Sequence, residues 1–288
     1  MSVTAKPTVA MSLTDQPSPR QEVRPLVGLI LNADDWGRDC EITRQTLHCK
    51  QRGTISSVSA MVFMADSEHA AALAREHGVD AGLHLNFTTT FTAPGAPTRL
   101  LEHQRQLRDY LRGHRLAPAV YHPFLVGSFE YVVKAQLDEF HRLYGISADR
   151  LDGHHHMHLC ANVLLRNLLP PGSIVRRNFS FQPGEKSWSN RIYRTIVDKR
   201  LARRHRLTDF LFSLPPIHPV ARVKRIFDLA NRFTVEVETH PGSLEEYKFL
   251  AEGPLLRLLG DIPIAHGFVV RGSPGNESGM KSPRSCTP

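Results

Sequence analysis

The chain has few cysteines and lacks any long apolar run. Its 4 Cys form no CxxC pair and no compact framework, so the sequence indicates neither a cysteine zinc site nor a disulfide scaffold. No stretch reaches the roughly 18 apolar residues of a membrane span, and the N-terminal region has no apolar core of a signal peptide. These absences predict a protein without a transmembrane segment, in the reducing cytoplasm.

Apolar residues make up 41% of the 288 residues. This is enough to bury a sizeable core, so disorder of the whole chain is excluded. Both ends are rich in Pro, Gly and Ser and show no apolar periodicity. We expect a single folded domain over residues 25–272 between disordered tails at 1–24 and 273–288.

Much of the net charge of +8 lies in residues 191–206, where seven Lys and Arg accompany one acid, Asp198. Interleaved apolar residues at helical spacing predict an amphipathic helix with a solvated basic face. Binding of an anionic substrate or partner is the alternative, and the role of this segment stays open.

Short apolar runs alternate with helical patterns along the chain. The pattern predicts strands over 26–33, 55–64, 81–87, 150–153, 173–175, 233–239 and 262–269, and helices over 41–51, 66–77, 99–112, 129–144, 161–169, 191–206, 220–231 and 243–259. Such alternation is typical of an α/β fold with a parallel sheet, open or closed into a barrel. Functional side chains in such folds gather at the carboxyl ends of strands.

Polar clusters do follow the predicted strands. They are Asn32–Gly37, Gly82–Asn86, Asp152–His158 and Glu238–Gly242. Taken singly, each also fits a plain turn or a hydrogen-bonded core histidine. Their shared position after strands is what a functional site requires.

Two of the clusters contain neighbouring side chains of one kind. Asp34 and Asp35 are adjacent, so we expect their carboxylates to point to opposite sides of the chain. His154, His156 and His158 share a side in extended backbone, whereas His154 and His158 share a face in a helix. Either geometry can direct imidazoles at a metal ion.

One carboxylate and two imidazoles from three strand ends can form an open metal site. The candidate ligands are Asp35, His84 and His154. This mixed set suits Zn²⁺ or another divalent first-row metal, and suits Mg²⁺ less well because Mg²⁺ prefers oxygen ligands. With a second carboxylate and a further histidine nearby, such a site is equipped for hydrolysis.

The four clusters, in this order, resemble the motifs of the YdjC-like (ChbG/HpnK) family of carbohydrate deacetylases. The first resembles the family's NADD-aromatic-G, with Trp36 where Phe is usual, and the second resembles GLHLN(L)T. The third is similar to D-(S/G)-H-x-H-x-H and the fourth to HPG. The resemblance covers about residues 26–270 and is specific because all four motifs occur in register. Residues 178–216 match no motif of the family.

The resemblance implies a distorted (β/α) barrel related to NodB-type polysaccharide deacetylases, a divalent metal ion (Zn²⁺ or Mg²⁺) and removal of an acetyl group from an N-acetylated sugar or glycoconjugate. It implies Asp34 as general base and His240 as acid or oxyanion stabiliser. Arg176 would orient Asp34, with the adjacent Arg177 as the alternative. We expect substrate contacts from Asn86, His156 and His158, although the two histidines could also ligate the metal or support its ligands.

Two other functions stay open. The same site could hydrolyse another bond, such as a phosphoester, or the protein could be a non-catalytic metal- and anion-binding protein. We expect no nucleic-acid partner, because nucleic-acid binding gives no reason for polar groups to gather at four strand ends. The oligomeric state stays open, with a homodimer as one option.

Overall fold

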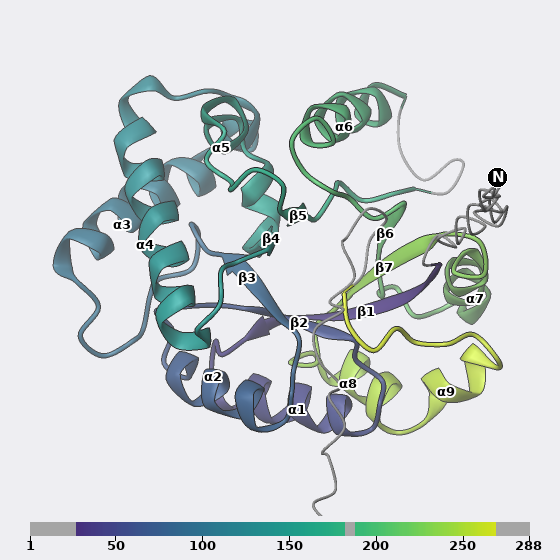
Figure 1. The fold of residues 1–288 in the computed structure, drawn as a ribbon. Coiled ribbons are helices and arrows are strands. Elements are labelled where there is room, and N and C mark those ends of the chain that lie inside the picture. The colour runs from purple at the N-terminus through teal and green to yellow at the C-terminus, as the bar shows by residue number, and fades with distance from the viewer. Residues whose placement is uncertain (1–26, 182–187, 269–288) are drawn as a thin grey trace, which may run out of the picture.

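A sheet of seven parallel strands forms the centre of the molecule. In this computed structural model, which describes residues 27–181 and 188–268, the strand order is β5-β4-β3-β2-β1-β7-β6. Helices cover the outside of the curved sheet (Figure 1). The strands are β1 (Gly28–Trp36), β2 (Ser57–Ala60), β3 (Ala81–Leu85), β4 (Arg150–Gly153), β5 (Ile174–Val175), β6 (Phe210–Ser213) and β7 (Thr234–Thr239). The predicted α/β class is confirmed.

Helices alternate with the strands along the chain. They are α1 (Cys40–Gln51), α2 (Ser67–Glu76), α3 (Thr98–Gly113), α4 (Val126–Tyr144), α5 (Ala161–Arg166), α6 (Trp188–Leu201), α7 (Val220–Leu229), α8 (Leu244–Ala251) and α9 (Pro254–Leu259). Short 3₁₀ helices lie at η1 (Ala117–Ala119), η2 (Pro123–Leu125) and η3 (His154–Leu159). At the start of α1, the Asp39 side chain accepts the backbone N–H of Ile42, a typical N-cap.

The sheet curves into a half-barrel with β5 and β6 at its edges. Ile174 of β5 forms a single parallel bridge with Arg206, just before β6. Farther along, the backbone N–H of Ser180 donates to the carbonyl of Leu211 in β6 (2.7 Å). These contacts join the edges without a continuous ladder, which confirms the predicted distorted barrel.

The two faces of the sheet differ in composition. On β1, Leu29, Leu31 and Ala33 are fully buried and belong to the apolar core under the helices. Asn32 and Asp34 alternate with them and point to the inner face of the half-barrel, because successive side chains of a strand point to opposite faces. The inner face therefore collects polar groups, and the outer face holds the core.

The helix predicted over residues 243–259 is wrong in one respect: the structure has two helices there, α8 and α9. Gly253 takes a left-handed φ of 96°, and Pro254 begins the new helix. Proline has no N–H to continue the first helix, and glycine tolerates the positive φ at the break.

The strand predicted over residues 262–269 is also wrong. The described part of it forms one parallel bridge, between Ile264 and Leu29. On that side of β1, the carbonyl of Leu29 accepts the backbone N–H of Ala265, but the next carbonyl, at Leu31, accepts the backbone N–H of Ser56. The segment after Ile264 therefore cannot extend its pairing with β1. The short strand β6 was not predicted at all.

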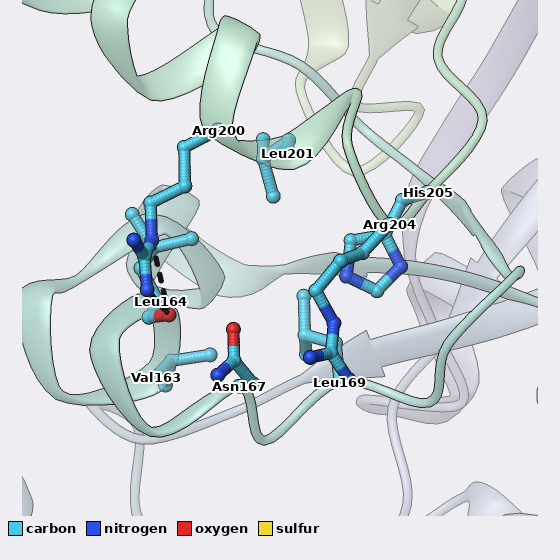
Figure 2. A pocket seen from close by; sticks show the side chains of 8 residues that line it. All are labelled: Val163, Leu164, Asn167, Leu169, Arg200, Leu201, Arg204 and His205. Carbon is cyan, nitrogen blue, oxygen red and sulfur yellow. Dashed lines mark hydrogen bonds between the residues drawn. The ribbon is translucent and has the colours of Figure 1, made fainter.

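The helix predicted over residues 191–206 is confirmed as far as Leu201, where α6 ends, and is wrong for residues 202–206, which form a turn that leads to the bridge at Arg206. On the inner side of α6, Val197 and Leu201 are buried. Arg200 donates from Nε and Nη2 to the carbonyl of Leu164 in α5 (3.3 and 3.0 Å; Figure 2). The cavity enclosed there is about 10 Å³, which leaves room for about one water molecule and none for a saccharide.

Three of the four cysteines lie among the described residues. Cys40, Cys49 and Cys160 are free thiols. Across residues 27–181 and 188–268, no helix combines the length and apolarity needed to cross a bilayer. The predicted tails, residues 1–24 and 273–288, lie outside the described residues.

Candidate active site at the carboxyl ends of the strands

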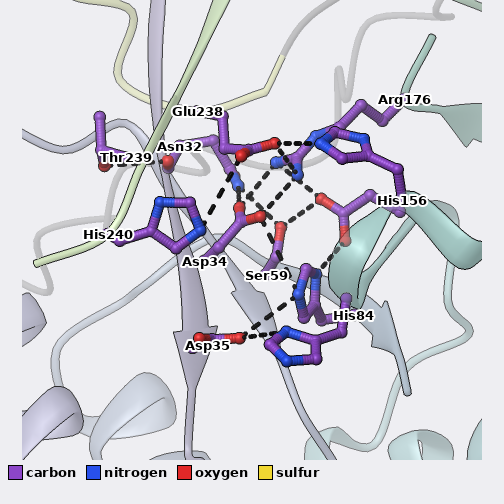
Figure 3. Close-up of polar contacts among 12 residues, drawn as sticks. Asn32, Asp34, Asp35, Ser59, His84, His156, Arg176, Glu238, Thr239 and His240 are labelled. Atoms are coloured by element: carbon purple, nitrogen blue, oxygen red, sulfur yellow. Dashed lines mark hydrogen bonds and ion pairs between the residues drawn. The ribbon is translucent and has the colours of Figure 1, made fainter. Parts of the chain in front are cut away.

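The register of the sheet brings the polar clusters together. His84 of β3 lies opposite Asp152 of β4, and Asn32 of β1 lies opposite Glu238 of β7. Because the strands are parallel, their carboxyl ends meet at one end of the half-barrel. Figure 3 shows the resulting network of side chains.

Both neighbouring carboxylates of β1 face this network, so the expectation that they point to opposite sides is wrong. The β1–β2 register shifts between Ala33 and Trp36, and Asp35 has a left-handed φ of 65°. Such an irregularity re-aims a side chain at the end of a strand. As a result, Asp34 Oδ2 and Asp35 Oδ1 lie 3.9 and 3.5 Å from Nε2 of His84.

The histidine cluster takes neither of the two predicted geometries. It forms the short helix η3, in which His155 and His156 have left-handed φ values of 55° and 57°. This turn directs the imidazoles of His154, His155 and His156 at different partners. His154 points to Asp35, His156 points to Glu238, and His155 Nδ1 lies 2.9 Å from the Thr88 hydroxyl.

Asp35, His84 and His154 form a buried triad that fits a metal ion. One ligand atom from each lies within 4.8 Å of the others. Asp35 Oδ1 is 2.9 Å from Nδ1 of His154, yet it is buried without a well-aligned hydrogen bond. His84 Nδ1 lies 2.8 Å from Asp152, which leaves Nε2 directed at the triad. A carboxylate of this kind behind a histidine is typical of metal sites.

The charges of the triad also fit a cation. Burial alone raises the pKa of the Asp35 carboxyl, but His154 and His84 outweigh it and hold the pKa well below its usual range. Burial alone lowers the pKa of His84, but the charges of Asp152 and Asp34 outweigh it and raise the pKa to about 10. The surroundings therefore favour positive charge at this point.

Arg176 is the centre of the neighbouring ion-pair network. Its Nη1 and Nη2 donate to Oδ2 (2.6 Å) and Oδ1 (2.7 Å) of Asp34. Its Nε donates to Glu236 (2.7 Å), and Asp152 (2.8 Å) and Glu238 (3.1 Å) complete the set. All these side chains are buried. One guanidinium thus holds four carboxylates and fixes both oxygens of Asp34.

The adjacent Arg177, which the sequence left as an alternative, points elsewhere. Its Nη2 donates to Asp198 of α6 (2.9 Å), and its Nη1 donates to the Thr208 carbonyl. The structure therefore places Arg176, and not Arg177, against Asp34.

His240 lies on the other side of Asp34, at the end of β7, and its side chain is 38% exposed. Its Nε2 is 3.8 Å from Glu238, and its Nδ1 is 3.7 Å from Glu246. Burial alone lowers the pKa of His240, but the Glu246 contact and the charges of Asp34 and Glu238 outweigh it and raise the pKa to about 9. The imidazole is consequently protonated at neutral pH.

Asn86 and His158, which the sequence predicted as substrate contacts, are buried inside the protein. Asn86 Oδ1 accepts the backbone N–H groups of Thr88 and Thr89 and shapes the turn after β3. His158 Nε2 donates to the carbonyl of Arg176 (2.9 Å), and burial followed by the nearby His156 lowers its pKa to about 3. Neither side chain is exposed.

A hollow of about 290 Å³ lies between η3, η1 and α6. Its lining includes His155, His156, Phe179 and Tyr193. His156 is partly exposed there, and its Nε2 lies 3.0 Å from Glu238. This volume lies near the lower limit of pockets that take small ligands.

Sequence reasoning gave no roles to Asp152, Glu236 and Glu238. A signal was present, because Glu236 and Glu238 sit at alternate positions of a strand whose other face is apolar. Two acids on the inner face of a buried sheet require a cation. That cation, Arg176, directly follows β5, a strand of only two residues.

Comparisons with known proteins identify the family of this chain. The family model described as YdjC-like protein matches residues 28–256. A carbohydrate deacetylase of Geobacillus stearothermophilus is 29% identical over 223 residues, 75% of this chain and 80% of that protein. A chitooligosaccharide deacetylase of Proteus mirabilis is 31% identical over 131 residues, 46% of this chain and 50% of that protein.

A solved structure shares the fold. It is a protein of Enterococcus faecalis provisionally named for cellobiose-phosphate cleavage, with a TM-score of 0.59, 17% identity, and coverage of 83% of this chain and 97% of that one. The family model spans more than half of the chain, including all four polar clusters. The chain therefore belongs to the YdjC-like protein family.

Proposed function

We propose that the protein is a metal-dependent hydrolase that removes the acetyl group from an N-acetylated saccharide or glycoconjugate. The observation that carries the proposal is the convergence of Asp35, His84 and His154 beside Asp34, whose two oxygens are held by Arg176. The names of the carbohydrate and chitooligosaccharide deacetylases among the relatives support the substrate class.

Asp35, His84 and His154 are the residues that would hold the ion. Two imidazoles and one carboxylate favour Zn²⁺ over Mg²⁺, because Mg²⁺ prefers an oxygen shell. A divalent ion bound there supplies a Lewis acid for the acetyl carbonyl and makes water more acidic.

Asp34 is the proposed general base. Its Oδ1 accepts N–H groups from Asn32 (2.8 Å) and Arg176 (2.7 Å), so its orientation is fixed before substrate binds. In this role the carboxylate takes a proton from the attacking water. Arg176 acts as a positioning residue, and its positive charge offsets the surrounding carboxylates.

His240 is the proposed general acid. It carries a proton at neutral pH because its pKa is raised to about 9, and its partial exposure allows it to reach a bound substrate. In this role it donates that proton to the nitrogen of the leaving amine as the amide bond breaks.

His156 is the proposed substrate contact, because it lines the hollow between η3 and α6 and its Nε2 lies 3.0 Å from Glu238. Asn86 and His158 are better described as positioning residues. Asn86 shapes the loop that carries Thr88, the hydroxyl partner of His155. His158 holds the backbone of Arg176.

Acetate release from N-acetylated chitooligosaccharides, measured with phosphate release from phosphoesters, tests this function. We expect acetate release by the zinc-loaded protein. In Asp34→Asn we expect a loss of about 10²- to 10⁴-fold, typical of removing an acid–base group, with bound metal unchanged. Phosphate release without acetate release would contradict the proposal, and so would full activity of the Asp34→Asn variant.

A further inference from the structure

Helix α6 has an exposed face that the proposed reaction does not use. Trp188, Ile192 and Ile196 follow one another at a spacing of four residues and are 77%, 39% and 62% exposed. Four-residue spacing places them on one side of the helix. The opposite side is already committed, since Val197 and Leu201 are buried and Arg200 is bonded to α5.

Basic side chains border this apolar face. Arg191 and Lys199 of α6 are exposed, and so is Arg203, which follows the helix, whereas Arg204 lies on the α5 side with Leu164 and Leu169. The single acid among residues 188–206, Asp198, is turned away and bonded to Arg177 and to the backbone N–H of Asn178. The outer side of α6 is therefore apolar along its middle and positive around it.

A second segment of the same character lies across the hollow from α6. Pro118 of η1 and Tyr193 of α6 line the same hollow. Around η1 and η2, Leu116, Val120 and Phe124 are 60%, 54% and 90% exposed. Residues 112–124 contain Arg112 and Arg115 and no acid. Two apolar and basic elements thus flank one opening.

We propose that α6 and the η1–η2 segment dock on the surface of an anionic lipid bilayer. Large apolar side chains enter the boundary between headgroups and acyl chains, while Arg and Lys at their border contact anionic headgroups. A second copy of this chain is a poor occupant, because a symmetric contact would set the same positive charges against one another. A nucleic acid would leave the isoleucines without an apolar partner.

The two tryptophans of the chain give a direct readout. Trp36 is fully buried and Trp188 is 77% exposed. On addition of vesicles of phosphatidylcholine and phosphatidylglycerol to the full-length protein, we expect a blue shift of tryptophan emission and co-sedimentation of the protein. The shift should be absent in Trp188→Phe and absent with vesicles of phosphatidylcholine alone.

Paired variants separate the apolar and charged contributions. The double variant Ile192→Glu and Ile196→Glu should lose binding about tenfold or more, and neutralising Arg191 and Arg203 to Gln should weaken binding about tenfold. The matched control is Leu244→Glu with Leu256→Glu, two exposed leucines on α8 and α9, across the molecule from α6 (Figure 1). This control should bind like the wild type.

The proposal is overturned if the protein fails to bind anionic vesicles, or if the isoleucine variant binds them as well as the control does. Binding to double-stranded DNA that the arginine variant loses and the isoleucine variant keeps, without vesicle binding, would also overturn it. Acetate release from a soluble saccharide, measured without vesicles, tests the deacetylase function separately. The two proposals can therefore fail independently.

Discussion

The two faces of the sheet are held by different interactions, although the same strands supply both. On the outer face, residues such as Leu29 and Leu31 are buried among apolar side chains. On the inner face, Asp34 and Glu236 are equally buried but lie among charges around Arg176. The comparison teaches that the outer face can stabilise the fold without any ligand, whereas the inner face depends on how its charges are balanced.

The inner face carries more acid than its arginine can neutralise. Burial raises the pKa of Glu236 to about 7 against the opposing charge of Arg176. Asp35 pairs instead with Arg38, His84 and His154. A divalent ion bound at the triad, as proposed above, would add positive charge beside these carboxylates.

Removing the central guanidinium should break the inner face most severely. Arg176→Leu leaves four carboxylates of the network without their shared cation. Loss of one partner of a buried ion pair costs about 3–5 kcal/mol, so we expect a fall of this size in the free energy of unfolding, measured in urea. Arg177→Leu is the matched control, since Arg177 is partly exposed, and it should cost about 1 kcal/mol. Equal losses in the two variants would contradict the account.

A cavity on the outer face should weaken the fold and spare the site. Leu29→Ala removes a fully buried side chain at the amino end of β1, far along the strand from Asp34. We expect a loss of about 3 kcal/mol in urea unfolding. Metal content and acetate release per folded molecule should stay at the wild-type level. A loss of either at temperatures where the variant is folded would show that the faces are not independent.

The pH dependence of stability should give the smallest effect. Burial, followed by the charge of His156, lowers the pKa of His158 to about 3 in the folded protein. The unfolded chain keeps a value near about 6.5 and so takes up the proton first as the pH falls. The contribution of His158 to the free energy of unfolding is complete at a pH above its pKa in the unfolded chain. It should fall by about 2 kcal/mol between about pH 7 and about pH 5.

His158→Asn provides the control for that measurement. The amide can still donate a hydrogen bond but does not titrate, so the variant should show a shallower loss of unfolding free energy over the same pH interval. The same slope in both proteins would assign the pH dependence to other groups.

Much of the fold could be predicted because it depends on local patterns. The alternation in β7 and the helical spacing in α4 are visible in the sequence, and β4 lies where it was predicted. The break at Gly253 and Pro254 was also visible in the residue types. Strand β6, which has four residues, could not be told from a loop.

The site could be predicted as a set of strand ends but not as a geometry. The turn at Asp35 depends on the register between β1 and β2, which no local pattern specifies. The left-handed His155 and His156 likewise depend on partners far away in the chain, Thr88 and Glu238. Arg176, and not Arg177, contacts Asp34 because its side chain points to the inner face of the sheet just after β5. A strand of two residues is too short to show from the sequence which side chains point inward.

Zinc binding by the metal-stripped protein, measured by titration calorimetry, tests the central claim most directly. His154→Ala removes a triad ligand, and His155→Ala is the matched control, since His155 is adjacent but points to Thr88. The account predicts one zinc ion per chain in the wild type and in His155→Ala, with affinity about tenfold or more weaker in His154→Ala. Equal zinc affinity in the wild type and His154→Ala would contradict it.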